Sequence, residues 1–213
     1  MSEGSYCVEK GGPLPYLLGV PFVRAAAHPV LCFLHGHDEG PPTPIEEALT
    51  RHGPFRPGNP KSSLGQFIVI APQMPERGDL WRRYAEDVRR TVLQVQKQYG
   101  GDPQRTYLTG FSFGGNGVFD LALDQPGRWA ALWSVDPTRV PERDPGCPVW
   151  LSVGILARFR KKIFTRALDL HDWQENKDLD RIILDEGADH VGSATSAYRD
   201  ERIYAWLLSK CQR

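Results

Sequence analysis

The sequence has no run of about 18 apolar residues, the length that a membrane-spanning helix requires. Its first residues have neither the basic start nor the apolar stretch of a signal peptide. An excess of charge of one sign is also missing, because 26 Lys and Arg residues balance 26 Asp and Glu residues. A balanced chain is not typical of proteins that bind nucleic acid or an anionic membrane. We therefore expect a cytoplasmic protein that binds a small molecule, and neither nucleic acid nor a membrane.

Cysteine is scarce, and its spacing argues against a zinc site. The four cysteines lie far apart, without the paired spacings of zinc ligands, at Cys7, Cys32, Cys147 and Cys211. Disulfide bonds are not expected. Cys32 lies inside an apolar run and is predicted to be a small core residue.

The chain shows no internal repeat and no linker. Its 18 prolines and 21 glycines are spread along the sequence instead of gathering in one segment, as in a domain with many short connections. A length of 213 residues fits one domain comfortably. We expect a single domain over residues 1–213, and no feature indicates an oligomeric state.

Apolar runs and helical periodicity alternate along the chain. Strands are predicted at residues 29–34, 67–71, 105–109, 130–135, 148–153 and 180–184. Helices are predicted at residues 45–51, 80–99, 117–123, 164–173 and 194–211. Such alternation requires crossover connections, so we predict an α/β fold with a mainly parallel sheet and helices on both faces. Ligand sites in such folds lie beyond the carboxyl ends of the strands.

A short glycine-rich motif, Gly110-Phe-Ser-Phe-Gly-Gly115, lies between a predicted strand and a predicted helix. A serine on a sharp turn at that position presents its hydroxyl group, and the flanking glycines leave room for the chain to fold back. The five-residue pattern is weak alone, but this context predicts that Ser112 is a nucleophile.

A serine hydroxyl group needs a positioned base to take its proton. His190 is the best placed of the six histidines, because it follows the last predicted strand and comes after the serine in the chain. His28 and His52 have no comparable position. His171 falls in a predicted helix and is expected to be a surface or packing residue. We therefore predict His190 as the general base.

Two backbone amides are predicted to stabilise an oxyanion. The amide of Phe113 begins the helix after the motif, where the helix dipole is positive. The second amide is expected from His37, just after the turn His35-Gly36 at the end of the first buried strand. Alternatively, His37 is an ordinary exposed loop histidine.

These residues resemble the α/β-hydrolase family, and within it the small lidless esterases. The segment Phe33-Leu-His-Gly-His-Asp-Glu-Gly40 is similar to the oxyanion turn of the carboxylesterase/phospholipase-like, polyhydroxybutyrate-depolymerase-like and feruloyl-esterase-like branches. Ile70-Ala-Pro-Gln-Met-Pro75, followed by Trp81, and the motif at Ser112 resemble the same branches. The resemblance implies a fold without a large lid and hydrolysis of carboxylic esters through an acyl-enzyme, without metal or cofactor.

The chain departs from the family at the acid that orients the histidine. The family places this acid in the loop after the strand predicted at 148–153, but the loop 154–162 contains no carboxylate, and Ala157 occupies the expected position. Asp136 is the first alternative, because it ends the preceding strand, although Asp136 before Pro137 is also a common turn start. Asp169 and Asp172 are further candidates. A fourth possibility is that Ser112 and His190 act as a dyad, or that hydrolysis is impaired.

Candidate substrate contacts come from the same edge. Arg158 begins a basic run that is either a solvated surface or a contact for an anionic group on a substrate or partner. Trp81 and Phe113 either line a pocket or belong to the core. A peptidase or thioesterase with the same residues, or a non-catalytic binding module of this fold, remains open as an alternative to an esterase.

Overall fold

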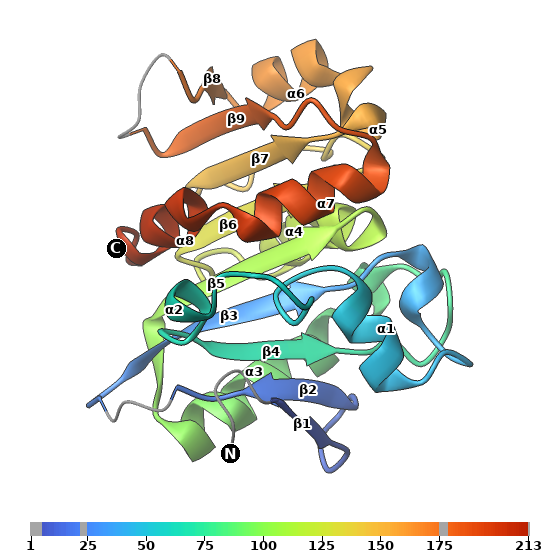
Figure 1. Ribbon diagram of the computed structural model, residues 1–213. Coiled ribbons are helices and arrows are strands. Elements are labelled where there is room, and N and C mark those ends of the chain that lie inside the picture. Colours follow the sequence, from blue (N-terminus) through green and yellow to red (C-terminus); the bar gives the residue numbers. More distant parts are fainter. Residues whose placement is uncertain (1–5, 22–24, 175–178, 213) are drawn as a thin grey trace.

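The computed structural model describes residues 6–21, 25–174 and 179–212. Within them the strands form one sheet, in the order β1-β2-β4-β3-β5-β6-β7-β9-β8 (Figure 1). The strands are β1 (Tyr6–Glu9), β2 (Tyr16–Gly19), β3 (His28–Leu34), β4 (Ile68–Pro72), β5 (Gly101–Phe111), β6 (Ala131–Val135), β7 (Val149–Val153), β8 (His171–Asp172) and β9 (Arg181–Asp185).

Most strand pairs are parallel, as predicted. Only the pairs β1–β2 and β2–β4 are antiparallel among the described strands. In the register of the central strands, Gly110 pairs with both Leu34 and Ser134. The carboxyl ends of β3, β5 and β6 therefore meet at one edge of the sheet.

Helices cover both faces of the sheet. They are α1 (Ile45–Arg51), α2 (Lys61–Leu64), α3 (Ala85–Tyr99), α4 (Phe113–Asp124), α5 (Ile155–Arg158), α6 (Lys161–Ala167), α7 (His190–Arg199) and α8 (Glu201–Leu208), with 3-10 helices η1 (His37–Glu39) and η2 (Trp81–Tyr84). None of the described helices is long and apolar enough to cross a membrane.

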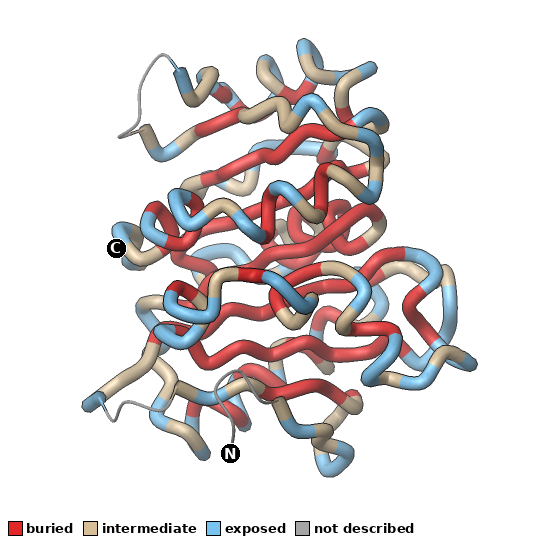
Figure 2. Tube along the Cα trace, viewed as in Figure 1, coloured by how far each residue is buried: buried red, intermediate tan, exposed pale blue. Residues whose placement is uncertain are grey.

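The core consists of two apolar layers, one on each face of the sheet. Residues of α3, α4 and α6 pack on one face, and residues of α1, α7 and α8 pack on the other. Figure 2 shows the central strands buried along most of their length, because side chains of both faces are covered. Cys32 is fully buried in the first layer, as the sequence predicts.

The predicted helix 164–173 is wrong in its second half. Helix α6 ends at Ala167, and Asp169 then adopts a positive φ of 49°, a backbone conformation that a helix cannot continue through. The chain turns there and His171 and Asp172 pair with β9 as the short strand β8. These two residues are therefore strand residues at the sheet edge.

The predicted closing helix 194–211 is two helices. Asp200 separates α7 from α8, and its side chain accepts a hydrogen bond from the amide of Arg202, which caps the start of α8. Helix α7 also begins earlier than predicted, at His190, with Asp189 as its cap. His190 is thus held by a helix start and does not lie in an open loop.

Candidate active site

Ser112 lies at the turn between β5 and α4, with a positive φ of 58°. The turn requires glycine on both sides, because a Cβ atom at Gly114 would lie 1.8 Å from the carbonyl oxygen of Leu34, and one at Gly110 would lie 2.3 Å from that of Gly114. The amide of Ser112 donates to the carbonyl oxygen of Val135 at the end of β6. These constraints hold the serine in a strained conformation at the carboxyl edge of the sheet.

His190 connects Ser112 to Asp136. Its Nε2 lies 3.0 Å from Ser112 Oγ, and its Nδ1 lies 2.7 Å from Asp136 Oδ2. The imidazole also packs on the ring of Phe111, with 4.5 Å between the ring centroids. The structure thus brings together three side chains that follow β5, β6 and β9. An imidazole held between a hydroxyl group and a carboxylate can move a proton from the one while the other fixes its orientation.

Asp136 is completely buried, and backbone amides surround its carboxylate. Oδ1 accepts hydrogen bonds from the amides of Gly154 (3.0 Å) and Ala157 (2.8 Å), and Oδ2 accepts a longer one from Leu156 (3.4 Å). The loop after β7, which lacks a carboxylate, therefore supplies donors to the carboxylate that comes from β6. Donors of this kind compensate for the loss of water around a buried charge.

The other carboxylates considered for this position lie elsewhere. Asp172 Oδ2 is 3.7 Å from Lys161 Nζ, and Asp169 Oδ1 is 4.0 Å from His171 Nε2. The geometry therefore favours Asp136 among the alternatives that the sequence leaves open.

Phe113 and His37 lie next to each other beside Ser112. Each is the first residue of a helix, α4 and η1 respectively, and amides in the first turn of a helix have no acceptor within that helix. Their rings meet edge to face, with centroids 4.9 Å apart. Gly36, which precedes His37, is so close that a Cβ atom there would lie 3.5 Å from the Cβ of Ser112.

His35 fixes the turn after β3, a role that the sequence did not predict. Its buried Nε2 accepts a hydrogen bond from the amide of Met74 (3.0 Å), so Nδ1 carries the proton and donates to the carbonyl oxygen of Gly36 (2.7 Å). Burial lowers the pKa of His35 to about 4. The ring is thus neutral near pH 7, and the turn is tied to the end of β4.

Glu39 also stabilises the turn after β3, a role that the sequence analysis did not predict. Its Oε2 accepts a hydrogen bond from the amide of Gly36 at 2.5 Å, while Oε1 is buried without a partner among the described residues. Burial raises the pKa of Glu39 to about 7. Gln73 adds support, because its Nε2 donates to the carbonyl oxygens of Glu39 and Thr43. The signal for this role was the position of Glu39 three residues after Gly36.

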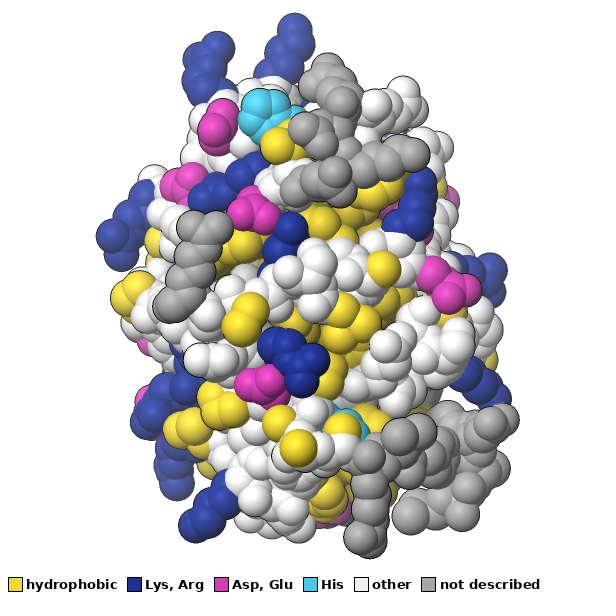
Figure 3. Space-filling view, turned by 90° about the vertical axis from the view of Figure 1, so that its left-hand side faces the viewer, with side chains coloured by type: hydrophobic (Ala, Val, Ile, Leu, Met, Phe, Trp, Pro, Cys, Tyr) yellow, Lys and Arg dark blue, Asp and Glu magenta, His cyan; other side chains and the backbone are white. Residues whose placement is uncertain are grey.

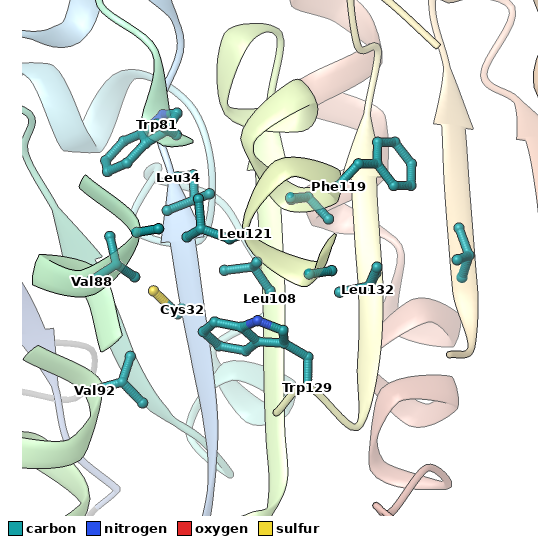
Figure 4. Packing of buried hydrophobic residues seen from close by; sticks show 14 of the residues in the cluster. Cys32, Leu34, Trp81, Val88, Val92, Leu108, Phe119, Leu121, Trp129 and Leu132 are labelled. Carbon is teal, nitrogen blue, oxygen red and sulfur yellow. The ribbon is translucent and has the colours of Figure 1, made fainter. Parts of the chain in front are cut away.

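Trp81 is a core residue and does not line a pocket. Only 1% of its surface is exposed, its indole nitrogen donates to the carbonyl oxygen of His35 (3.0 Å), and its ring packs against that of His35. Figure 4 shows it among the buried side chains near Leu34. Trp81 therefore belongs to the core, which was one of the two alternatives. The prediction that it contacts the substrate is wrong.

Arg158 has a protein partner. Its guanidinium pairs with both carboxylate oxygens of Asp185 and also donates to the carbonyl oxygen of Ala188. The charge that was predicted to contact an anionic substrate group is thus used to join α5 to the segment before α7.

Two hollows in the surface lie away from these residues. One hollow, of about 520 Å³, lies where β2 ends and β4 begins, and its lining includes Gly19, Phe55 and Phe67. The other, of about 580 Å³, is lined at the amino ends of β6, β7 and β9. Figure 3 shows the side of the molecule at which the parallel strands begin, where hydrophobic side chains lie between scattered charged ones. The candidate site lies instead at the carboxyl edge of the sheet, where 7% of the surface of Ser112 is exposed. Among the described residues, no group of three His, Cys, Asp or Glu side chains could hold a metal ion.

No family model matches the sequence, and no curated protein matches it. Solved structures do match. A thermostable esterase has a TM-score of 0.74 and 18% identity over 97% of this chain and 62% of its own, so the chain spans less than two thirds of that protein. The fluorophosphonate-binding serine hydrolase FphF of Staphylococcus aureus has a TM-score of 0.66 and 12% identity over 96% of this chain and 98% of its own.

A feruloyl esterase module from Clostridium thermocellum, complexed with sinapinate, has a TM-score of 0.66 and 13% identity over 95% of this chain and 86% of its own. At these identities the similarity is one of fold. The chain therefore has the α/β-hydrolase fold, as its resemblance to that family predicts.

Proposed function

We propose that the protein is a serine hydrolase that cleaves carboxylic esters through an acyl-enzyme intermediate. The observation that carries the proposal is the position of His190, with one ring nitrogen 3.0 Å from Ser112 Oγ and the other 2.7 Å from Asp136 Oδ2. A hydroxyl group, an imidazole and a carboxylate in this order are the parts that nucleophilic acyl transfer needs.

In the first half of the reaction, Ser112 Oγ attacks the carbonyl carbon of the ester while His190 Nε2 takes the hydroxyl proton. The amides of Phe113 and His37 donate to the oxyanion of the tetrahedral intermediate. Asp136 stabilises the imidazolium that has formed and keeps its orientation. The intermediate then collapses, the bond to the alcohol oxygen breaks, and the alcohol leaves with the proton of His190. The acyl group remains on Ser112.

In the second half, water gives a proton to His190 Nε2 as it attacks the acyl carbon. The second tetrahedral intermediate is stabilised by the same amides. Its collapse releases the carboxylic acid and returns the proton from His190 to Ser112 Oγ. No metal ion or cofactor takes part in these steps.

Two considerations favour an esterase over the alternatives. The structures with the same fold include a thermostable esterase and a feruloyl esterase module. A module that only binds a ligand has no need of a serine, a histidine and a buried carboxylate in hydrogen-bond contact. Peptides and thioesters could react by the same steps, so the leaving group is the part of the proposal that kinetics must decide.

The test is hydrolysis of p-nitrophenyl acetate, compared with the matching p-nitroanilide and thioester. We expect the ester to be hydrolysed fastest and Ser112→Ala to lower the turnover number at least about a thousandfold. Ser196→Ala, on the exposed side of α7, is the matched control and should retain full activity. Equal rates for the wild type and Ser112→Ala would refute the proposal.

A further inference from the structure

Exposed apolar side chains gather at one place beside the candidate active site. Among the described residues, six large apolar side chains are more than a third exposed, and four of them lie on α5, directly after α5, on α6 and at the start of α7. These four, named the apolar rim, are Ile155 (41% exposed), Phe159 (82%), Ile163 (57%) and Val191 (50%). A cluster of this kind on a protein surface marks an interaction site more often than single exposed residues do.

The apolar rim borders the residues proposed to carry out catalysis. Ile155 follows Gly154, whose amide donates to Asp136, and Val191 follows His190. Helices α5 and α7 contact each other, and Arg158 joins α5 to the segment before α7 through Asp185 and the carbonyl oxygen of Ala188. Figure 1 shows α5, α6 and the start of α7 together at the carboxyl edge of β7 and β9. A surface that docked on the rim would therefore lie beside Ser112.

The segment that carries most of the rim is amphipathic. Phe159 and Ile163 are four residues apart and exposed, whereas Phe164 and Leu168 are buried in the core. The segment consists of the short helices α5 and α6, which Phe159 and Arg160 separate. Its buried apolar side chains anchor it, and its other apolar side chains face the surroundings, as in amphipathic segments that lie in a lipid interface.

The segment that carries Ile155, Phe159 and Ile163 is basic. Residues 155–168 contain five basic residues and no acidic one. Arg158 pairs with Asp185, and Lys161 Nζ lies 3.7 Å from Asp172. In the part of the chain that the structure describes, no carboxylate forms an ion pair with the exposed Arg160, Lys162 or Arg166. A net charge of zero for the whole chain therefore conceals a local excess of cations.

We propose that the apolar rim and these three cations dock the protein on an anionic lipid surface, from which it takes amphiphilic ester substrates. Apolar side chains enter the boundary between headgroups and acyl chains, and Lys and Arg side chains attract anionic headgroups. The charge of the segment selects an anionic lipid surface as the occupant. This proposal differs from the expectation, drawn from net charge, that the protein binds no membrane, and the vesicle experiment decides between them. The part of the proposal that concerns ester substrates rests on the proposed function.

The test of docking is co-sedimentation with vesicles of phosphatidylglycerol and phosphatidylcholine, using Ser112→Ala so that the lipid is not hydrolysed. We expect binding to phosphatidylglycerol vesicles that weakens with added salt and is at least about tenfold weaker for phosphatidylcholine alone. Phe159→Ser with Ile163→Ser should weaken the binding at least about tenfold. Replacing Arg160, Lys162 and Arg166 together by Gln should weaken the binding by up to about a hundredfold, because each cation near the surface strengthens binding about fivefold.

Matched controls come from α3, where Leu93 is 40% exposed and Lys97 carries a comparable charge. Leu93→Ser and Lys97→Gln should bind vesicles as strongly as the parent protein. No binding to phosphatidylglycerol vesicles, or equal loss in the control and rim variants, would overturn the docking proposal. Binding of a protein partner without vesicle binding would overturn it as well.

Hydrolysis of a dissolved ester and of an ester embedded in vesicles distinguishes failure of the docking proposal from failure of the proposed function. With the catalytic serine intact, Phe159→Ser with Ile163→Ser should hydrolyse dissolved p-nitrophenyl acetate at the wild-type rate but lose at least about tenfold on a long-chain ester embedded in phosphatidylglycerol vesicles. Vesicle binding without any ester hydrolysis would refute the proposed function and support docking. Equal loss on both esters would refute the rim as a docking surface.

Discussion

Asp136 Oδ2 lies 2.7 Å from His190 Nδ1, although the two residues are 54 positions apart and follow different strands. The family that the sequence resembles takes this carboxylate from the loop after β7. Here the loop contributes the amides of Gly154, Leu156 and Ala157, which hold a carboxylate that comes from the end of β6. The carboxylate that contacts His190 therefore follows β6, one strand before the position that the resemblance implies.

Asp136→Asn should lower kcat/KM for p-nitrophenyl acetate at least about a hundredfold, because the amide cannot stabilise the imidazolium of His190. An asparagine side chain still accepts hydrogen bonds from the amides of the β7 loop, so the fold should be retained in circular dichroism. Asp172→Asn is the control and should keep wild-type activity. A change of less than about threefold in Asp136→Asn would remove this residue from the mechanism.

Gly114→Ala should destabilise the fold by about 3 kcal/mol or more, because the new Cβ atom would meet backbone atoms of Leu34 and His35, which cannot move independently. Urea denaturation followed by tryptophan fluorescence measures the effect. Gly11→Ala is the control, since a Cβ atom there meets nothing within 4 Å. Equal midpoints for the two variants would show that the turn at Ser112 is looser than described.

Glu39→Gln should change how stability depends on pH. Burial raises the pKa of Glu39 from 4.5 to about 7, so the folded state holds the proton more tightly than the unfolded state. The stabilisation is complete below about pH 4.5 and is lost as the pH rises through about 7. Relative to Glu39→Gln, the wild type should lose up to about 3 kcal/mol of unfolding free energy between pH 4.5 and pH 8.

Urea denaturation of both proteins at several pH values measures this difference. The exposed Glu46→Gln on α1 is the control, and its stability should follow that of the wild type at every pH. Parallel curves for the wild type and Glu39→Gln would contradict the pKa assigned to Glu39.

Arg158→Gln should lower the free energy of unfolding by about 1 kcal/mol or less, because its ion pair with Asp185 is partly exposed and screened. Arg160 lies two positions further along the chain and forms no ion pair among the described residues. Arg160→Gln should therefore have no measurable effect on stability. Kinetics distinguish the two roles considered for Arg158. If it contacts an anionic substrate group after all, KM will rise for an ester that carries a carboxylate but not for a neutral ester.

Local patterns in the sequence predicted much of the fold and the sharp turn at Ser112. The central strands are short apolar runs, and the turn at Ser112 needs glycines at fixed positions, so both are visible without tertiary structure. The antiparallel strands β1 and β2 were missed because each has only four residues, and β2 is joined to the rest of the sheet through the distant strand β4. The end of α6 was missed because the backbone of Asp169 reverses there without a glycine or proline.

The residues that support the site were harder to predict than the residues that form it. Asp136 could be named only as one alternative, since its contact with His190 depends on how β6 and α7 pack. The roles of His35 and Glu39 depend on burial and on hydrogen bonds to the turn between them. The spacing of Gly36 and Glu39 indicates a contact between them, but neither the burial of these side chains nor the bond from Met74 to His35 can be read from the sequence.

The most direct test of the central claim is labelling with a fluorophosphonate probe, followed by intact-protein and peptide mass spectrometry. If Ser112 is a nucleophile activated by His190, the wild type will gain one probe mass on the peptide that contains Ser112. Ser112→Ala will remain unlabelled, and His190→Ala will react at least about a hundredfold more slowly. Labelling of Ser112→Ala at the wild-type rate, or no labelling of the wild type, would contradict the account.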